Sequence, residues 1–296
     1  MTILEVGPRD GLQNEPIPIP TEVKVEFIRG LVESGLREIE ATSFVSPKWV
    51  PQMGDASDLW PQLPSGAQFS ALVPNLKGLE SALQVGCDRI ALFTAASDAF
   101  TLKNINKTVL ESIEVFREVM AAFRAQAPGG FVRAYVSTAF ECPYAGRIDP
   151  EQVMVVVERI LELGVDEISI GDTIGAASTN EVHALTKVLL EEVSLDQLAY
   201  HFHDTRGGAI ANVAAALEHG VHRFDASAAG LGGCPYAPGA GGNLATEDLV
   251  YFLERNGVAT GIDLAKLAQA SRPVLQHLGR GPISKVQIWE LAREKR

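Results

Sequence analysis

Short apolar runs recur along the chain, and a segment whose apolar residues have helical spacing follows each of them. This alternation is typical of strand-helix units that build one parallel sheet. The predicted strands are Ile3–Val6, Glu38–Thr42, Phe69–Val73, Arg89–Thr94, Val132–Thr138, Glu167–Gly171, Leu198–Phe202 and Arg223–Ser227. The predicted helices lie near residues 21–34, 55–61, 76–85, 105–126, 150–163, 179–193, 206–219 and 245–256.

The number and order of these units predict a closed barrel. Eight units match a (β/α)8 barrel of the α/β class, a TIM barrel, and we expect it to occupy residues 1–260. A doubly wound open sheet is the alternative, but no Gly-x-Gly-x-x-Gly follows the first strand. Residues 261–296 are predicted to form a C-terminal helical appendage, with an apolar first part and a basic end.

Composition limits the possible partners. A formal net charge of −12 argues against nucleic acid and anionic membranes as partners. No run of eighteen apolar residues occurs, and we expect no targeting leader before the first strand. The three cysteines are widely spaced, which favours a reducing cytoplasm over a disulfide framework. We expect a cytoplasmic homo-oligomer that acts on a small molecule.

Two histidines at the end of the seventh predicted strand give the first chemical signal. Side chains alternate faces along a strand, so His201 and His203 point the same way while Phe202 points the other way. Two neutral imidazoles on one face can share a divalent metal. Asp204 and Thr205 can cap the next helix, which places the pair where barrels carry their chemistry. The alternative is two partly buried histidines that are hydrogen-bonded to backbone.

The loop after the first predicted strand carries Arg9 and Asp10. The Asp10 carboxylate is a hard oxygen ligand that could join two imidazoles on Mg²⁺ or Mn²⁺, and the guanidinium could stabilise an oxyanion. The alternative is an ion pair that only closes the loop. Glu5 and Glu40 are acids inside apolar strands, and we expect each to accept hydrogen bonds from Arg9 or to order a ligand.

Further polar residues fall at the same ends of later strands. Asp172 ends the sixth predicted strand, where it could act in the site or cap a turn. Asn243 precedes the last barrel helix, where it could cap that helix or offer a carbonyl oxygen to a metal.

Residues 230–243 are rich in glycine and are predicted to form a mobile lid. Cys234 lies in this lid loop, where a thiol could transfer a proton. Cys142 follows the fifth strand and is expected to be structural, with a functional role as the alternative, whereas Cys87 is expected to be buried and inert.

Five segments together resemble the 3-hydroxy-3-methylglutaryl-CoA lyase family: residues 6–15, 39–53, 171–175, 201–205 and 232–237. The resemblance spans nearly the whole chain. It implies a metal bound by Asp10, His201, His203 and Asn243. The catalytic residues that it implies are Arg9, which stabilises an enolate, Cys234, which transfers a proton, and Asp10, Glu40, Asp172 and His201. In one departure, Arg206-Gly207-Gly208 stand where the family usually has Tyr-Gly-Gln.

The resemblance implies a metal-dependent lyase of leucine and ketone-body catabolism. With Mg²⁺ or Mn²⁺ it would cleave 3-hydroxy-3-methylglutaryl-CoA, an acyl-CoA, to acetyl-CoA and acetoacetate by a retro-Claisen reaction. The alternatives are a lyase for a longer branched 3-hydroxyglutaryl-CoA, a condensing synthase of the same barrel group and a non-enzymatic metal- or CoA-binding protein.

Overall fold

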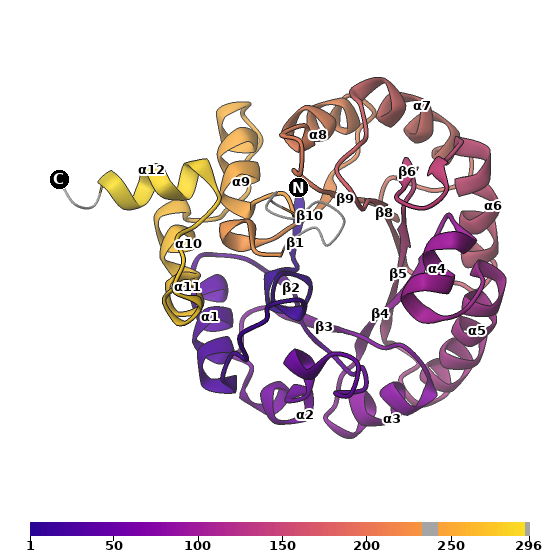
Figure 1. Cartoon of the computed structure of the whole chain (residues 1–296), viewed down its shortest axis with the longest axis horizontal. Helices are drawn as coiled ribbons and strands as arrows, with labels where there is room; N and C mark the ends of the chain where they lie inside the picture. Colours follow the sequence, from indigo (N-terminus) through magenta and orange to yellow (C-terminus); the bar gives the residue numbers. More distant parts are fainter. Residues whose placement is uncertain (233–241, 294–296) are drawn as a thin grey trace.

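Eight parallel strands close into a barrel in the computed structural model, which describes residues 1–232 and 242–293. Their order around the barrel is β1-β10-β9-β8-β5-β4-β3-β2 (Figure 1). The strands are β1 (Thr2–Glu5), β2 (Glu38–Ser43), β3 (Gln68–Leu72), β4 (Arg89–Ala95), β5 (Phe131–Ser137), β8 (Glu167–Asp172), β9 (Leu198–Phe202) and β10 (Arg223–Ala226). The predicted TIM barrel is confirmed, and each predicted strand agrees within one residue at both ends.

Helices surround the barrel on its outer side (Figure 1). They are α1 (Thr21–Glu33), α2 (Ala56–Leu59), α3 (Leu76–Gln84), α4 (Asp98–Ile105), α5 (Val109–Gln126), α6 (Pro150–Leu161), α7 (Thr179–Leu189), α8 (Ala209–Glu218) and α9 (Thr246–Arg255). A small antiparallel pair, β6 (Glu141–Cys142) and β7 (Gly146–Arg147), follows β5. No described helix is long and apolar enough to span a membrane.

The predicted helix at 105–126 was wrong at its start, because the structure has two helices there. α4 ends at Ile105, because the next residue, Asn106, has a left-handed φ of 54° that stops the helix. α5 then begins with a capping box, in which the Thr108 hydroxyl accepts from the Glu111 N–H and the Glu111 carboxylate accepts from the Thr108 N–H. The Thr108-x-x-Glu111 pattern was therefore the sequence signal for the start of α5.

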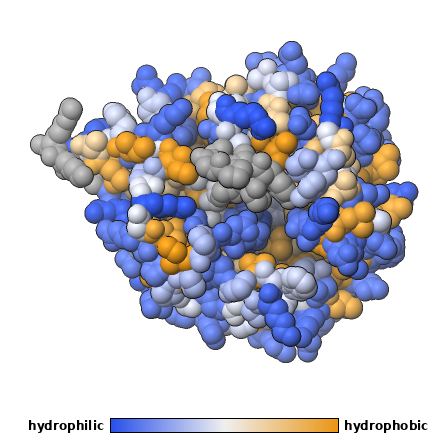
Figure 2. All heavy atoms as spheres, viewed as in Figure 1, coloured by the Kyte–Doolittle hydropathy of each residue, from blue (hydrophilic) through white to orange (hydrophobic). Residues whose placement is uncertain are grey.

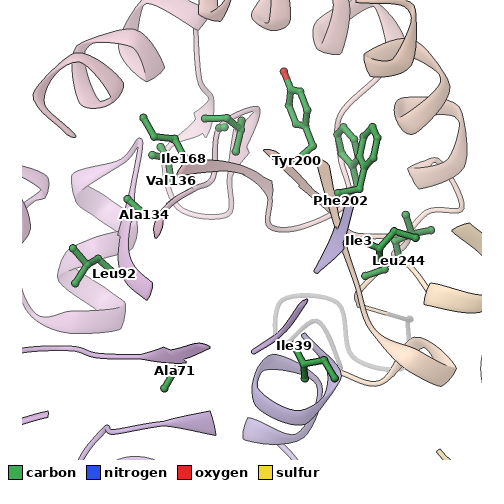
Figure 3. Packing of buried hydrophobic residues seen from close by; sticks show 14 of the residues in the cluster. Ile3, Ile39, Ala71, Leu92, Ala134, Val136, Ile168, Tyr200, Phe202 and Leu244 are labelled. Carbon is green, nitrogen blue, oxygen red and sulfur yellow. The ribbon is translucent and has the colours of Figure 1, made fainter. Parts of the chain in front are cut away.

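Apolar side chains of the strands point outward and pack under the helices. Figure 3 shows Leu92, Ala134 and Ile168 on neighbouring strands, with their side chains directed away from the barrel axis. Burying one such large side chain contributes roughly 1.5–3 kcal/mol. Figure 2 shows hydrophilic residues over most of the face viewed in Figure 1, with hydrophobic residues in small separate groups.

The interior of the barrel is charged, because residues between these apolar positions face inward. Its buried polar side chains include Glu40, Arg133, Glu167, Ser169 and Asp225. TIM barrels are more often filled by branched aliphatic side chains. Buried charges of this kind must be paired, and the pairs described below position the candidate site.

The C-terminal segment forms three helices: α10 (Leu264–Ala270), α11 (Arg272–Leu278) and α12 (Lys285–Arg293). They lie beside α1 and α9 (Figure 1). At Gly30 in α1 a Cβ would lie 3.0 Å from Ala270, so glycine permits the close approach of α1 and α10. Leu267 and Val274 belong to the same hydrophobic cluster as the barrel. The C-terminal appendage is therefore helical and packs against the barrel. Its division from residues 1–260 as a separate structural unit stays a prediction.

Candidate active site

The candidate site lies at the carboxyl ends of the strands, where the first and eighth loops approach each other. The first loop is a short π-helical turn, η1 (Gly7–Gly11), which carries Arg9 and Asp10. At Gly7 a Cβ would lie 2.5 Å from Glu5 Oε1, and at Gly11 one would lie 2.8 Å from Ser227 Oγ. Both glycines therefore permit η1 to pack against its neighbours without a clash.

Asp10, His201 and His203 come together at this rim. Each offers one potential ligand atom, and these atoms all lie within 4.8 Å of one another. The His201 Nε2 atom is 4.0 Å from Asp10 Oδ2. The two histidines share a face as predicted, while Phe202 turns outward and stacks on Tyr200 with 4.9 Å between ring centroids. Three side chains of types that bind divalent metals thus converge from the first loop and from the end of β9.

Charge and burial give these three groups different proton affinities. Burial favours the protonated form of Asp10, but Arg9 and the two histidines lower the pKa of Asp10 to about 2. Burial, together with His201, lowers the pKa of His203 to about 3. Burial also disfavours the charged ring of His201, but Asp225 and Asp10 outweigh it and raise the pKa of His201 above 6.5. At neutral pH Asp10 is ionised and His203 is neutral, as metal ligands must be.

Two buried atoms at the rim support a fit to a cation. The His203 Nδ1 and Asn243 Oδ1 atoms have no hydrogen-bond partner among the described residues. The Asn243 amide donates to Asp10 Oδ2 over 2.9 Å, and its backbone pairs with that of His203. Asn243 is not the cap of α9, since Ala245 occupies that position. Imidazole nitrogen and carboxylate or amide oxygen together form a donor set that can hold a divalent cation.

Arg9 is held between two carboxylates. Its Nε donates to Glu40, and its Nη1 donates to Asp10 Oδ1 over 2.6 Å. The Tyr135 hydroxyl donates to the other oxygen of Glu40 over 2.9 Å, and the guanidinium lies 5.3 Å from the centre of the Tyr135 ring. No described residue is hydrogen-bonded to Nη2 of Arg9. The guanidinium is thus fixed with one amino group left for a ligand.

Glu5 does not pair with Arg9, so this part of the expectation was wrong, and the alternative that Glu5 orders a ligand stays a prediction. Its carboxylate accepts from the N–H groups of Gly7 and Ala228, each over 2.8 Å, and from the Thr246 hydroxyl over 2.6 Å. These three donors satisfy the buried carboxylate without a cation. Glu5 therefore ties the first loop to the eighth loop. Burial raises its pKa to about 7, against the lowering effect of these donors.

Glu247 holds the start of the eighth loop from the other side. Both of its oxygens accept from the Ala229 N–H, over 3.0 and 2.9 Å. Ala229 has a left-handed φ of 62°, an unfavourable conformation for a residue with a side chain. The carboxylate stabilises this turn. Burial raises the pKa of Glu247 to about 8.

Asp172 makes the contacts of a turn cap. Its two oxygens accept from the N–H groups of Ala176 and Ala177, over 2.9 and 3.1 Å. Burial raises its pKa to about 6 although both N–H groups oppose this change. Arg206, which departs from the family pattern, donates to the carbonyls of Ile174 and Gly175 and so holds the same turn. A catalytic role for Asp172 stays a prediction.

The cysteines differ in what can be said of them. Cys234 and most of the predicted lid lie outside the described residues. The buried Cys142 thiol accepts hydrogen bonds from the Ser97 hydroxyl and from two backbone N–H groups, which are structural contacts. Cys87 is buried as predicted, and burial raises the pKa of its thiol to about 12, so it is inert.

Sequence reasoning missed the partners of His201. The ring is hydrogen-bonded through Nδ1 to Asp225 over 3.1 Å, not to backbone. Asp225 also accepts from Ser169 over 2.9 Å and from Arg133. A usable signal was present, since Arg133 and Tyr135 are polar residues at alternate positions of one apolar strand. Such spacing indicates side chains that face the barrel interior.

This fold and site define a TIM-barrel protein with a candidate divalent-metal centre at the carboxyl ends of its strands. The HMGL-like family model matches residues 1–274, and the chain belongs to that family. The resemblance inferred from the five segments is thereby confirmed.

Relatives of this family cover almost the whole chain. The hydroxymethylglutaryl-CoA lyase of Pseudomonas mevalonii is 48% identical over 99% of this chain and 98% of the relative. The crystal structure of the HMG-CoA lyase of Bacillus subtilis has a TM-score of 0.94 and 46% identity, over 98% of this chain and 97% of that one. An HMG-CoA lyase from Acinetobacter baumannii, solved with coenzyme A and 3-methylmalate, has a TM-score of 0.91 and 39% identity, over 100% and 95% of the two chains.

His203→Ala tests the metal centre. Loss of a ligand should weaken Mn²⁺ binding at least about tenfold, because even the loss of groups that only orient ligands costs about 10–100-fold. Isothermal titration calorimetry of the metal-free protein measures the change. His222→Ala, at a surface contact with Asp196, is the control and should bind as the parent does. Unchanged affinity in a folded His203→Ala protein would exclude His203 as a ligand.

Glu247→Gln tests the acid that holds the eighth loop. The native Glu247 has a pKa near 8, whereas its ordinary value is 4.5. Between these values the native state keeps a proton that the unfolded chain has lost, so the free energy of unfolding falls as pH rises. Each pH unit costs up to about 1.4 kcal/mol per group.

Urea unfolding across this pH window should show a shallower fall for Glu247→Gln than for the parent, because glutamine cannot ionise. Glu191→Gln, at an exposed position, should keep the parental slope. A parental slope in Glu247→Gln would show that this carboxyl does not retain its proton in the native protein.

Proposed function

We propose that the chain is a hydroxymethylglutaryl-CoA lyase, which cleaves 3-hydroxy-3-methylglutaryl-CoA to acetyl-CoA and acetoacetate. The observation that carries the proposal is the convergence of Asp10, His201 and His203 beside the fixed guanidinium of Arg9. A metal-type donor set next to a cation suits a reaction in which negative charge develops on oxygen. The relatives that are named as lyases support the same reaction.

The proposed ligands of the cation are Asp10, His201, His203 and Asn243. When bound, Mg²⁺ or Mn²⁺ would polarise the hydroxyl of the substrate and lower its pKa. The two buried atoms without partners, His203 Nδ1 and Asn243 Oδ1, support this assignment. Asp10 is kept ionised by Arg9, which makes it available as a ligand.

Arg9 would stabilise the enolate of acetyl-CoA as the carbon–carbon bond breaks. Two of its nitrogens are engaged by Glu40 and Asp10, so its orientation is fixed before the reaction begins. A preorganised donor needs no rearrangement when charge develops. Glu40 would act by holding Arg9, since Tyr135 engages its second oxygen.

Two proton transfers complete the reaction. The proton of the substrate hydroxyl goes to a base of the site, either Asp10 or a neighbouring group. A second proton must reach the enolate carbon, and we assign it to the Cys234 thiol of the lid. The motive is the chemistry of a thiol within a glycine-rich loop. Glu5 and Glu247 would fix the base of that loop.

Two alternatives share these residues. A condensing synthase is less favoured, because the relatives that cover almost the whole chain are named as lyases. A lyase for a longer branched acyl chain would share every proposed ligand. The A. baumannii protein solved with coenzyme A supports an acyl-CoA substrate for this chain. The predicted homo-oligomer and cytoplasmic location stay predictions.

Product analysis with the purified, metal-supplemented protein tests the function. The parent should release acetoacetate and acetyl-CoA from 3-hydroxy-3-methylglutaryl-CoA, and it should do so faster than it cleaves a longer homologue. Condensation of acetyl-CoA with a 2-oxo acid, in the absence of cleavage, would establish the synthase instead.

Arg9→Lys tests the role of the guanidinium. Lysine keeps the charge but lacks the planar fork that Glu40 and Asp10 engage. Loss of a transition-state donor should lower kcat by about 10²–10³-fold with KM nearly unchanged. Steady-state kinetics gives both constants, and Arg147→Lys at an exposed ion pair should behave as the parent. A raised KM with parental kcat would mean that Arg9 only binds substrate.

Cys234→Ser tests the proposed proton donor. A hydroxyl has a far higher pKa than a thiol, so turnover should fall by about 10²–10⁴-fold while Mn²⁺ affinity is retained. Turnover in a reducing, metal-saturated assay measures the effect. Cys142→Ser and Cys87→Ser are controls that should alter stability more than turnover. Near-parental turnover of Cys234→Ser, or a greater loss in Cys142→Ser, would remove the lid thiol from the mechanism.

A further inference from the structure

Asp225 is a buried carboxylate of β10 with three side-chain partners. Its Oδ2 atom is 3.1 Å from His201 Nδ1 and accepts from the Ser169 hydroxyl over 2.9 Å. Its Oδ1 atom accepts from Arg133. The residue is only 2% exposed, so its carboxylate is buried among these partners. Asp225 takes part in no step of the reaction proposed above.

We propose that Asp225 is a positioning residue, which fixes the tautomer and the direction of the His201 ring. An ionised carboxylate only accepts hydrogen bonds, so Nδ1 of His201 must be the protonated nitrogen. The lone pair of the neutral ring is then on Nε2, which faces Asp10. A histidine that binds metal through one nitrogen needs this arrangement at the other. The inference rests on the proposed metal centre.

The position of Asp225 is itself fixed by a chain of ion pairs through the barrel. Arg133 on β5 bridges Asp225 and Glu167 on β8, and it lies 2.6 Å from Glu167. Glu167 in turn pairs with Arg223 on β10, and Arg223 pairs with Glu38 on β2 over 3.2 Å. Charges of opposite sign thus alternate from His201 toward the amino ends of the strands. Every residue of this chain of ion pairs lies on a strand of the barrel. The Asp225 carboxylate is therefore held in place and does not move with the His201 ring.

The two proposed metal histidines differ in this respect. His201 has an orienting carboxylate on Nδ1, whereas neither ring nitrogen of His203 is hydrogen-bonded to a described residue. Tyr135 adds an edge contact to the His201 ring, with 6.2 Å between centroids. Of the pair, His201 is therefore the ligand whose direction the barrel sets in advance.

The tautomer can be measured on the unaltered protein. Nitrogen-15 NMR of the histidine side chains, in the metal-free protein at alkaline pH, should show His201 protonated on Nδ1 and bare on Nε2. A proton on Nε2 would overturn the proposal. This measurement needs neither substrate nor a variant.

Asp225→Asn tests the consequence for metal binding. Asparagine has nearly the same shape and can still accept from Arg133, but its amide can donate to Nδ1 and so move the ring proton to Nε2. Mn²⁺ affinity, measured by electron paramagnetic resonance, should fall about 10–100-fold, and the NMR signals should show the exchanged tautomer. Asp166→Asn is a control, because Asp166 also pairs with an arginine, Arg124, but it precedes the amino end of β8, whereas the site is at the carboxyl ends of the strands. It should bind Mn²⁺ as the parent does.

The outcomes separate a positioning role from a structural one. Parental Mn²⁺ affinity in a folded Asp225→Asn protein, even with a lowered unfolding temperature, would overturn the proposal. If Asp225→Asn does not fold, the tautomer of the parent decides. If the parent fails to cleave 3-hydroxy-3-methylglutaryl-CoA while the tautomer and the Mn²⁺ affinity are as expected, the proposed function is refuted and this inference stands.

Discussion

The cost of burying charge inside the barrel is the constraint on which the site depends. An isolated ion transferred from water to a protein interior loses several kcal/mol even after relaxation. This barrel carries Glu40, Arg133, Glu167 and Asp225 in its interior, and each has a partner of opposite charge. The pairs cross between strands, so the need for charge compensation also fixes side-chain directions. Arg9 and His201 at the rim take their orientation from Glu40 and Asp225.

Two buried carboxyl groups that have no cationic partner, those of Glu5 and Glu247, hold loops instead of orienting the side chains of the site. Glu5 and Glu247 are fully buried, and their partners are hydrogen-bond donors of loops and of one hydroxyl. Their raised pKa values follow from burial that no positive charge offsets. They connect the first loop to the start of the eighth loop. The two loops on either side of Asp10, His201 and His203 are therefore held to each other. Ion pairs orient Arg9 and His201, whereas Glu5 and Glu247 hold the loops on either side of them.

Local patterns predicted the parts of the fold and site that depend on neighbouring residues. The alternation of strand and helix units along the chain predicted the barrel, and the His201-x-His203 spacing predicted the shared face. Contacts that join distant residues could not be predicted in this way. Arg133 and Asp225 are separated by 92 positions, and Glu5 and Thr246 by 241. No local rule could indicate that Glu5 turns toward backbone N–H groups rather than toward Arg9. The donors of Glu5 lie beside it because β1 is next to β10 in the closed barrel, and this strand order cannot be read from neighbouring residues.

Asp10 links the two halves of the candidate site. One of its oxygens accepts from Arg9, and the other accepts from Asn243 and faces His201. A single carboxylate therefore sets the separation between the guanidinium and the cation-type donors. A substrate that bridges them must present one oxygen to the metal side and a second, which becomes negative during reaction, to Arg9. A hydroxyl and a thioester carbonyl on either side of the breaking bond meet this requirement, because cleavage transfers charge from the first oxygen toward the second. The residues that hold Asp10 and Arg9 together thus favour carbon–carbon cleavage over hydrolysis at a single carbonyl.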